Sequence, residues 1–410
     1  MPGSKSIANR ALVCAALAEG SSTLTNVASG EDTAAMIDCL AAMHIDIALD
    51  GTSARIEGVA GRPVGGGELN ARLAGTTSRF MTAMAGLSSI PSLVTGDDPL
   101  RRRPMKPLHD ALRQLGATVR SVDASDHLPV WVSGDSLVGG TVSLPGDVSS
   151  QYVSALMLIA PYLPLGIDIR LTSPLVSRPY VAITVAVMSA FGASGIAIGE
   201  HRIGVEPSGY SGTSYEIEAD ASSASYPLAA AAITGGVVQV HGLGRDALQG
   251  DAAFVDVLQS MGCTTAVGEN SIEVQGSASL RGVEIDMADL SDLVPTLAAV
   301  AVFAETPTRI TGVGFIRRKE SDRIGDLVNG LRALGCDAVE EEDGLLIRPV
   351  PIEKLVGANL AVHDDHRLAM AWSLIALKVE GIVIDHAEVV GKSWPEWWSV
   401  RSRLLASPTK

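Results

Sequence analysis

The chain is poor in several residue types, and each shortage excludes a class of protein. Aromatic residues make up only 4% of its 410 residues, so its 47% hydrophobic content rests on Ala, Val, Leu and Ile, as in a well-packed globular interior. No apolar stretch reaches membrane-spanning length without interruption, and the N-terminus lacks the basic-plus-apolar pattern of a signal peptide. We therefore expect no membrane contact and a cytoplasmic location.

Cysteine is scarce as well. The four cysteines are Cys14, Cys39, Cys263 and Cys336; they lie in apolar helical patterns, and no two have CxxC spacing. A disulfide framework or a zinc site needs closer spacing, so these residues are expected to be buried, reduced thiols.

Basic residues are outnumbered, with 31 Lys and Arg against 46 Asp and Glu, which gives a formal net charge of −15. Such a chain is not drawn to nucleic acid or acidic lipid by its overall field. A phosphate-binding site must therefore be a local cluster of basic residues.

What the chain does have is length and a faint internal repeat. A chain of 410 residues favours two large domains. Helix-like segments, most with a Gly near the end, occur at 33–43, 108–117, 183–193, 254–263 and 326–336, each followed by a β-prone run. The spacing of roughly 70 residues is longer than that of solenoid repeats. Ordinary α/β alternation would also place a helix every few tens of residues, but the shared Gly favours a supersecondary unit of strands and helices used about six times.

Several helices are expected to open on small or hydroxylated residues. Residues 2–10 read Pro-Gly-Ser-Lys-Ser-Ile-Ala-Asn-Arg, with Ser4 as a good N-cap and Lys5, Ser6 and Arg10 on the first turns. Similar openings occur at 74–79, 146–151 and 220–226. Free backbone N–H groups at a helix start favour anions. Each opening alone is an ordinary N-cap, but four of them, two with Lys or Arg, favour a site for several anionic groups.

Four charged clusters complete the inventory: 101–104, 317–323, 364–367 and 391–395. An Arg triplet or a mixed-charge run is usually a solvated surface. Asp-Asp-His at 364–366 suggests metal ligands, but no companion His spacing supports them, and we expect no metal.

The basic residues in these motifs and clusters differ in the kind of anion that they are suited to bind. Arg323 and Arg367 suit a carboxylate, which a planar guanidinium binds in bidentate fashion. Lys5, Arg103 and Lys392 suit a phosphate. Asp292 and Glu320 are acidic groups that such a cationic site could use for proton transfer.

Taken together, these motifs resemble one family. Pro-Gly-Ser-Lys-Ser-x-x-Asn-Arg, Ala-Gly-Thr, Arg-Pro before a helix, Val-Ser-Ser-Gln, Asp-Ala-Ser-Ser-Ala-Ser-Tyr, Lys-Glu-Ser-Asp-Arg and Asp-His-Arg-x-Ala-Met occur in this order. The chain resembles the 3-phosphoshikimate 1-carboxyvinyltransferase (EPSP synthase) family from residue 2 to about residue 400.

The resemblance implies an α/β (α+β) fold. It predicts two similar domains, each built from three βαβαββ units with helices inside and sheets outside. Residues 4–217 would form the first domain, residues 218–410 the second, and residues 1–3 the crossover.

The resemblance also implies the reaction. Members transfer the enolpyruvyl group of phosphoenolpyruvate to the 5-hydroxyl of shikimate 3-phosphate and release phosphate, by addition and elimination through a tetrahedral intermediate. They use no metal, no cofactor and no covalent enzyme adduct. The expected partners are these two substrates, with no nucleic acid or membrane, and the expected state is a monomer.

Carried over position by position, the resemblance assigns a role to each matching residue. Asp292 would accept the proton of the 5-hydroxyl, and Glu320 and Lys5 would handle protonation at the enol carbon, with His366 as a supporting donor. Arg323 and Arg367 would hold the carboxylate of phosphoenolpyruvate, and Lys319 would lie near both substrates. The phosphate of phosphoenolpyruvate would be held by Lys5, Gly75, Arg103, Gln151 and Lys392. Shikimate 3-phosphate would be held by Ser6, Arg10, Ser149, Ser150, Ser177 and Tyr180.

The chain also departs from the family pattern. Leu73 stands where Asn is common, Phe80 where Pro is common, and Phe315 where an Asn often contacts the shikimate phosphate. Members usually carry a further segment before Pro-Gly-Ser-Lys that forms a strand of the second domain, whereas this chain begins at Met1-Pro2. We therefore expect either a truncated or misassigned N-terminus or an unpaired sheet edge, which would be an aggregation liability and the weak point of stability.

Two alternatives remain open. The sister enzyme that transfers enolpyruvyl to UDP-N-acetylglucosamine typically relies on a Cys in the loop that corresponds to 97–104, and this chain has none there. A non-catalytic anion-binding paralogue would bind shikimate 3-phosphate and release no phosphate.

Overall fold

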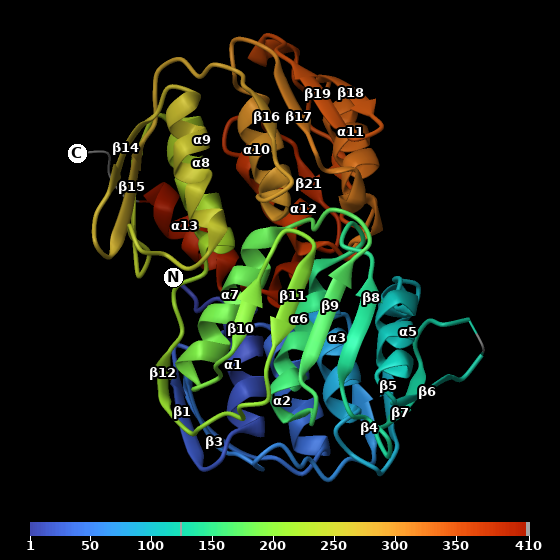
Figure 1. Cartoon of the computed structure of the whole chain (residues 1–410). Helices are drawn as coiled ribbons and strands as arrows, with labels where there is room; N and C mark the ends of the chain where they lie inside the picture. The colour runs from blue at the N-terminus through green and yellow to red at the C-terminus, as the bar shows by residue number, and fades with distance from the viewer. Residues whose placement is uncertain (124, 407–410) are drawn as a thin grey trace. The chain divides into compact units, whose positions relative to one another are not determined.

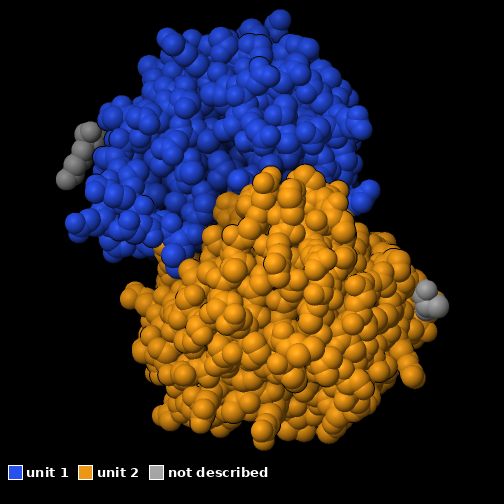
Figure 2. All heavy atoms as spheres, in the orientation of Figure 1, with its two compact units in different colours: residues 1–2, 219–410 blue, residues 3–218 orange. Residues whose placement is uncertain are grey.

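The computed structural model describes residues 1–123 and 125–406, which form two compact units (Figure 2). Unit 2 comprises residues 3–218, and unit 1 comprises residues 1–2 together with 219–410. The expected boundary between residues 217 and 218 lies one residue before the observed one. Each unit has its own core of buried Ala, Val, Leu, Ile and Met side chains.

Unit 2 is built on helices that are buried almost all round. In α1, α3 and α6 nearly every side chain is buried, which is the pattern of a central helix rather than an amphipathic surface helix. Its helices are α1 (Lys5–Leu17), α2 (Glu31–Ala42), α3 (Gly75–Ala85), α4 (Asp98–Arg101), α5 (Lys106–Gln114), α6 (Ser150–Ile159), the 3-10 helix η1 (Ala160–Tyr162) and α7 (Arg178–Ala190) (Figure 1).

The strands of unit 2 form three four-stranded sheets with one shared pattern. The orders are β12-β1-β3-β2, β4-β5-β7-β6 and β8-β9-β11-β10, and in each the first strand pairs in parallel with the second while the other pairs are antiparallel. The strands are β1 (Ser21–Thr25), β2 (Asp46–Asp50), β3 (Ser53–Glu57), β4 (Glu68–Asn70), β5 (Ser92–Thr95), β6 (Thr118–Ser121), β7 (Val130–Ser133), β8 (Gly140–Leu144), β9 (Ile167–Leu171), β10 (Ile196–Ile198), β11 (Arg202–Val205) and β12 (Ser214–Glu216).

Unit 1 has the same kind of central helices. Every side chain of α10 and α12 is buried, and most of those in α8 are. Its α-helices are α8 (Ala221–Thr234), α9 (Phe254–Ser260), α10 (Val294–Ala301), α11 (Arg323–Ala333), α12 (His366–Ile375) and α13 (Trp397–Ala406). Its 3-10 helices are η2 (Gly250–Ala253), η3 (Ser291–Leu293), η4 (Gly314–Arg318), η5 (Ile352–Lys354) and η6 (Ala387–Lys392).

The sheets of unit 1 are less complete. Its strands are β13 (Val237–His241), β14 (Thr264–Val267), β15 (Ser271–Gln275), β16 (Glu284–Asp286), β17 (Thr308–Thr311), β18 (Asp337–Glu341), β19 (Gly344–Arg348), β20 (Asn359–Leu360) and β21 (Val383–Ile384). The sheet β16-β17-β19-β18 follows the pattern of unit 2. Over the described residues, the sheet β13-β15-β14 lacks the parallel edge strand, and the last sheet has only β20 and β21.

The repeat predicted from the sequence is thus real but uneven. Helices α2, α5, α7, α9 and α11 coincide with the five helical segments, and a strand follows each of them. In four cases the connecting residue is a Gly with positive φ, namely Gly116, Gly192, Gly262 and Gly335; after α2 His44 takes this conformation instead. The described part of unit 1 is less regular, because its first sheet has one strand fewer and its last sheet two strands fewer than the four-stranded sheets of unit 2.

Within residues 1–123 and 125–406, no helix is long and apolar enough to cross a bilayer.

Candidate active site

In unit 2, the predicted anion-binding residues lie at helix starts. Ser4 caps α1 by accepting a hydrogen bond from the backbone N–H of Ile7, as the sequence predicts. Lys5 follows on the first turn, and its Nζ lies 2.8 Å from the carboxylate of Asp32 on the first turn of α2. Both side chains are largely buried, so this ion pair fixes the direction of the ammonium group.

Arg10 is deeply buried, with 2% of its surface exposed. Its guanidinium donates to Ser6 O and Tyr180 O and to the hydroxyls of Thr184 and Ser154, which ties α1 to α6 and α7. Within residues 1–123 and 125–406, the second N–H of Nη1 donates to no protein atom. Burial lowers the pKa of Arg10 to about 10, so the group stays charged at neutral pH.

The start of α3 meets Arg103. A Cβ placed on Gly75 would lie 2.4 Å from Nη1 of Arg103, so only glycine allows the guanidinium this close to the helix start. Gln151, on the first turn of α6, donates to the hydroxyl of Thr76 at 3.2 Å. Two predicted phosphate ligands, Arg103 and Gln151, therefore reach the same helix start.

The remaining predicted residues of unit 2 lie at helix starts. Ser149 caps α6 by accepting from the backbone N–H of Gln151, and Ser150 is the first residue of that helix. Ser177 caps α7 with a left-handed backbone, at a φ of 52°, and is buried. Tyr180 lies on the first turn of α7, where its carbonyl holds Arg10.

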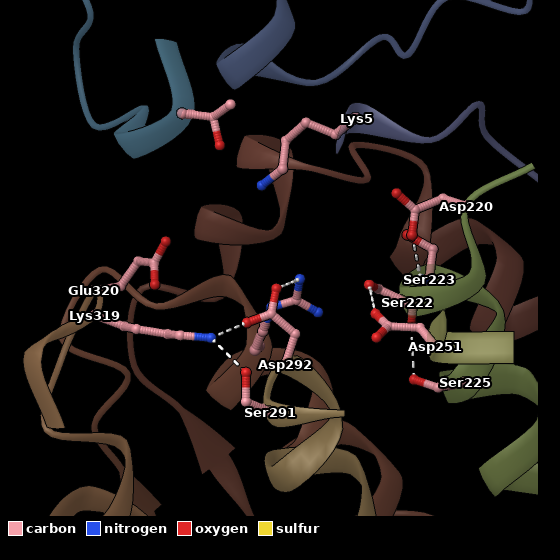
Figure 3. Close-up of polar contacts among 12 residues, drawn as sticks. Lys5, Asp220, Ser222, Ser223, Ser225, Asp251, Ser291, Asp292, Lys319 and Glu320 are labelled. Atoms are coloured by element: carbon pink, nitrogen blue, oxygen red, sulfur yellow. Dashed lines mark hydrogen bonds and ion pairs between the residues drawn. The ribbon is translucent and has the colours of Figure 1, made fainter. Parts of the chain in front are cut away.

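In unit 1, the charged residues predicted from the sequence form one cluster around Asp292. Its carboxylate contacts Lys319 Nζ at 2.5 Å (Figure 3). It also contacts Arg367 Nη2 at 2.6 Å and Arg323 Nη1 at 3.0 Å. Burial by itself would raise the pKa of Asp292, but Arg367, Lys319 and Arg323 outweigh it and hold the pKa well below its usual range. Asp292 is therefore ionised.

Glu320 joins the same cluster. It contacts Arg323 Nη2 at 2.8 Å and Lys392 Nζ at 3.5 Å. Lys392 is 3% exposed, so its ammonium depends on such acidic neighbours. Burial lowers the pKa of Lys319, which Asp292 opposes.

The structure adds residues to which the sequence reasoning gave no role. Asp365, fully buried at the N-cap of α12, accepts from Nε of Arg323 at 2.6 Å and from the backbone N–H of Arg367 at 2.9 Å. Arg79, on α3, donates to Gly75 O and Pro104 O and so braces the segment that carries Arg103. Asp32 holds Lys5. The position of Asp365 directly before a helix could have identified it as an N-cap. No local sequence pattern points from Asp32 to Lys5, or from Arg79 to Pro104.

The cluster in unit 1 can bind an anion and move a proton. Four cations, Lys319, Arg323, Arg367 and Lys392, face three carboxylates, those of Asp292, Glu320 and Asp365. A carboxylate or phosphate can share the cations, and a displaced acid can take a proton. Within the described residues, no group of three or more His, Cys, Asp or Glu side chains is arranged to hold a metal ion.

Comparison with known proteins gives a consistent result over the whole chain. Residues 1–400 match the model of the family described as EPSP synthase (3-phosphoshikimate 1-carboxyvinyltransferase). Proteins named 3-phosphoshikimate 1-carboxyvinyltransferase are 40% identical in Methanosphaerula palustris, over 97% of this chain and 94% of the relative, and 40% identical in Nostoc punctiforme, over 99% and 95%. The solved structure of EPSP synthase from Acinetobacter baumannii aligns with a TM-score of 0.81 at 27% identity, over 98% of this chain and 94% of that one.

Proposed function

This chain belongs to the EPSP synthase (3-phosphoshikimate 1-carboxyvinyltransferase) family, and we propose that it transfers the enolpyruvyl group of phosphoenolpyruvate to the 5-hydroxyl of shikimate 3-phosphate. The observation that carries the proposal is the ionised Asp292 in contact with three cations, at the position where the family resemblance expects the base. The match over nearly the whole chain, to relatives with this name, favours this reaction over a UDP-N-acetylglucosamine transferase or a binding-only paralogue.

In the proposed reaction, the 5-hydroxyl oxygen attacks C2 of phosphoenolpyruvate while its proton passes to Asp292 and C3 gains a proton. The tetrahedral adduct then loses a proton from C3, and the bond from C2 to the phosphate oxygen breaks. The products are the enolpyruvyl ether and inorganic phosphate, so atoms and charge balance without a cofactor.

The contacts of Asp292 explain how binding could prepare this base. Arg323 and Arg367, the proposed ligands of the substrate carboxylate, are also two of the three cations that hold Asp292. A second carboxylate that accepts hydrogen bonds from these guanidinium groups weakens their attraction for Asp292. The proton affinity of Asp292 then rises at the moment when a base is needed.

The remaining residues are assigned to proton transfer at C3 and to the phosphate groups of the two substrates. We assign proton transfer at C3 to Glu320 and Lys5, whose carboxylate and ammonium are held by Lys392 and Asp32. The phosphate of phosphoenolpyruvate is assigned to Lys5, Gly75, Arg103, Gln151 and Lys392. Shikimate 3-phosphate is assigned to Ser6, Arg10, Ser149, Ser150, Ser177 and Tyr180. Lys319 is assigned a place near both substrates.

The proposal includes a location and an oligomeric state. The four cysteines are buried and free of disulfides, and burial raises the thiol pKa of Cys14 and Cys39 to about 12. These inert thiols support a reducing compartment, and we propose a cytoplasmic monomer.

The direct test of the base is Asp292→Asn. Turnover, measured as enolpyruvyl ether by mass spectrometry, should fall about 10²–10⁴-fold, because the amide cannot accept the hydroxyl proton. The KM for phosphoenolpyruvate should not rise, because Arg323 and Arg367 lose a competing carboxylate. An Asp292→Asn variant that keeps near wild-type turnover would remove Asp292 from the mechanism.

A further inference from the structure

The first helices of the two units are held in corresponding ways. In unit 2, Asp32 follows Gly30-Glu31 at the start of α2 and contacts Lys5 on the first turn of α1. In unit 1, Asp251 follows Gly250 at the start of η2 and accepts a hydrogen bond from Ser222 on the first turn of α8 (Figure 3). Each carboxylate thus contacts the first turn of the helix that precedes it in the sequence, and one strand lies between the two helices along the chain.

The two acids differ in their partner. Asp32 pairs with a cation, whereas α8 has no Lys on its first turn and Asp251 is met by a hydroxyl. Among the described residues, no Lys or Arg nitrogen lies within ion-pair distance of Asp251, and its side chain is 5% exposed. A buried carboxylate without a cation is costly, and such groups concentrate where charge has a function.

The loop that carries Asp251 is built to hold it there. Gln249 accepts from the backbone N–H of Ala221 at 3.1 Å and donates to Ala219 O at 2.6 Å, which clamps the loop to the start of α8. Asp220 caps the same helix by accepting from the N–H of Ser223 at 2.7 Å. The position of Asp251 is therefore fixed from two sides.

Figure 3 shows the carboxylate of Asp251 pointing toward the side on which Asp292 of η3 lies. The charged groups that act on Asp251 are Asp292, Arg367 at the start of α12 and Asp220. Burial, followed by repulsion from Asp292, raises the pKa of Asp251 to about 6, against the opposing effects of Ser222 and Arg367. Interaction between two titrating groups is reciprocal, so a charge on Asp251 opposes the charge on Asp292 by the same free energy.

We propose that Asp251 is a positioning residue of this site that acts through Asp292: its carboxylate repels that of Asp292 and makes Asp292 a better proton acceptor. The inference rests on the proposed role of Asp292 as the base. Above pH 6 Asp251 is charged, and its repulsion of Asp292 offsets part of the attraction that Lys319, Arg323 and Arg367 exert on Asp292. Below pH 6 Asp251 takes up a proton and this support disappears.

Two substitutions should move the pH profile of kcat/KM in different ways. In the wild type, kcat/KM should fall as the pH drops through about 6. Asp251→Asn should remove this step and lower the rate at pH 8 about three- to tenfold, as expected for a weaker base. Ser222→Ala removes a hydrogen bond to the ionised carboxylate, so the step should move to higher pH. If Asp251 had a purely structural role, the substitutions would lower kcat/KM without moving the pH at which kcat/KM falls.

The matched control is Asp326→Asn. Asp326, on α11, is another acid of unit 1 whose pKa burial raises, and its charged neighbours are His363, Asp322 and Asp365 rather than Asp292. Its removal should leave the step in place. A wild-type step that survives in Asp251→Asn, or that does not move upward in folded Ser222→Ala, would overturn the proposal.

A titration without turnover separates this inference from the proposed function. In carboxyl ¹³C NMR of aspartate-labelled protein, one resonance should titrate near pH 6, vanish in Asp251→Asn, and titrate at lower pH in Asp292→Asn. If that resonance keeps its midpoint in Asp292→Asn, the coupling is refuted. If the coupling is seen but no enolpyruvyl ether forms, the proposed function fails and the role of Asp251 in it fails too.

Discussion

At the residue scale, buried charged side chains are oriented by contacts with several protein groups. Arg10 illustrates this, because four of its N–H groups are donated to the protein and its guanidinium lies over the ring of Phe80, 5.3 Å from the ring centroid. Phe80 itself is 1% exposed. The ring closes one face of the guanidinium, so the remaining N–H of Nη1 has a fixed direction.

Phe80→Leu should therefore weaken binding of shikimate 3-phosphate. The substitution keeps an apolar side chain but removes the cation–π contact, and the KM for shikimate 3-phosphate should rise about tenfold while that for phosphoenolpyruvate changes little. Steady-state kinetics with each substrate varied measures the split. Phe191→Leu, a buried Phe of the same unit that contacts Tyr215 instead, is the control. Equal changes in both KM values would contradict the account.

His109 makes unit 2 sensitive to acid. It is fully buried on α5, and neither ring nitrogen has a hydrogen-bond partner within the described residues. Burial, followed by the charge of Arg113, lowers its pKa to about 4. The unfolded chain takes up this proton near pH 6.5, so stability is full above that pH and is lost as the pH falls toward 4.

His109→Leu should reduce that loss. Between pH 7 and pH 4.5 the free energy of unfolding, from urea titrations, should fall less than in the wild type, by up to about 2 kcal/mol. His201→Gln, which changes an exposed histidine, should follow the wild-type curve. A His109→Leu curve parallel to the wild type would mean that this histidine does not titrate on unfolding.

At the element scale, four of the five repeated turns from helix to strand have a glycine with positive φ. Gly192 ends α7 at a φ of 91°, and a Cβ there would meet no atom closer than 3.7 Å. Its need for glycine is therefore purely conformational. Gly116 has a φ of 104°, and a Cβ would also lie 2.0 Å from Ser136 O.

Gly192→Ala should destabilise the protein by about 1–2 kcal/mol, the cost of a left-handed backbone for a residue with a Cβ. Gly116→Ala should cost more, because a steric clash adds to the strain. Gly204→Ala on β11 is the control, since its φ is not positive and a Cβ meets nothing within 4 Å. Thermal unfolding of the three variants checks the order; equal losses would contradict it.

Local sequence patterns predicted the helix starts and ends well. They did not predict which side chains hold the charged residues of the site in place. Ser4 and Asp220 cap their helices as their positions suggest, and the glycines mark helix ends. The contacts from Asp32 to Lys5, Asp365 to Arg323 and Asp251 to Ser222 join residues 27, 42 and 29 positions apart. Such pairs arise only when whole repeats pack, which periodicity and capping do not encode. Lys5, Arg323 and Arg367 were predicted as anion ligands from their charge and their place in the motifs, and the family resemblance then assigned each a substrate group.

At the scale of the whole molecule, two separate cores and unequal sheets should make unfolding uneven. Unit 1 contains Trp372, Trp394, Trp397 and Trp398, whereas the fifth Trp, Trp131, lies in unit 2. Its sheet β13-β15-β14 has one strand fewer than the corresponding sheets of unit 2 over the described residues. Fewer paired backbone groups favour earlier unfolding of unit 1.

Tryptophan fluorescence should therefore report a transition at lower urea than circular dichroism at 222 nm, which averages both units. The two probes are read on the same samples across one titration. Coincident midpoints would show that the units unfold together and that the shorter sheet does not set the stability.

The central claim is that the charged cluster around Asp292 serves transfer of an enolpyruvyl group to shikimate 3-phosphate. The most direct measurement is inorganic phosphate released from phosphoenolpyruvate by the purified chain, with and without shikimate 3-phosphate. Phosphate release should require shikimate 3-phosphate and should not occur when UDP-N-acetylglucosamine is the only acceptor. Release without an acceptor, or no release from a folded sample that binds shikimate 3-phosphate, would contradict it.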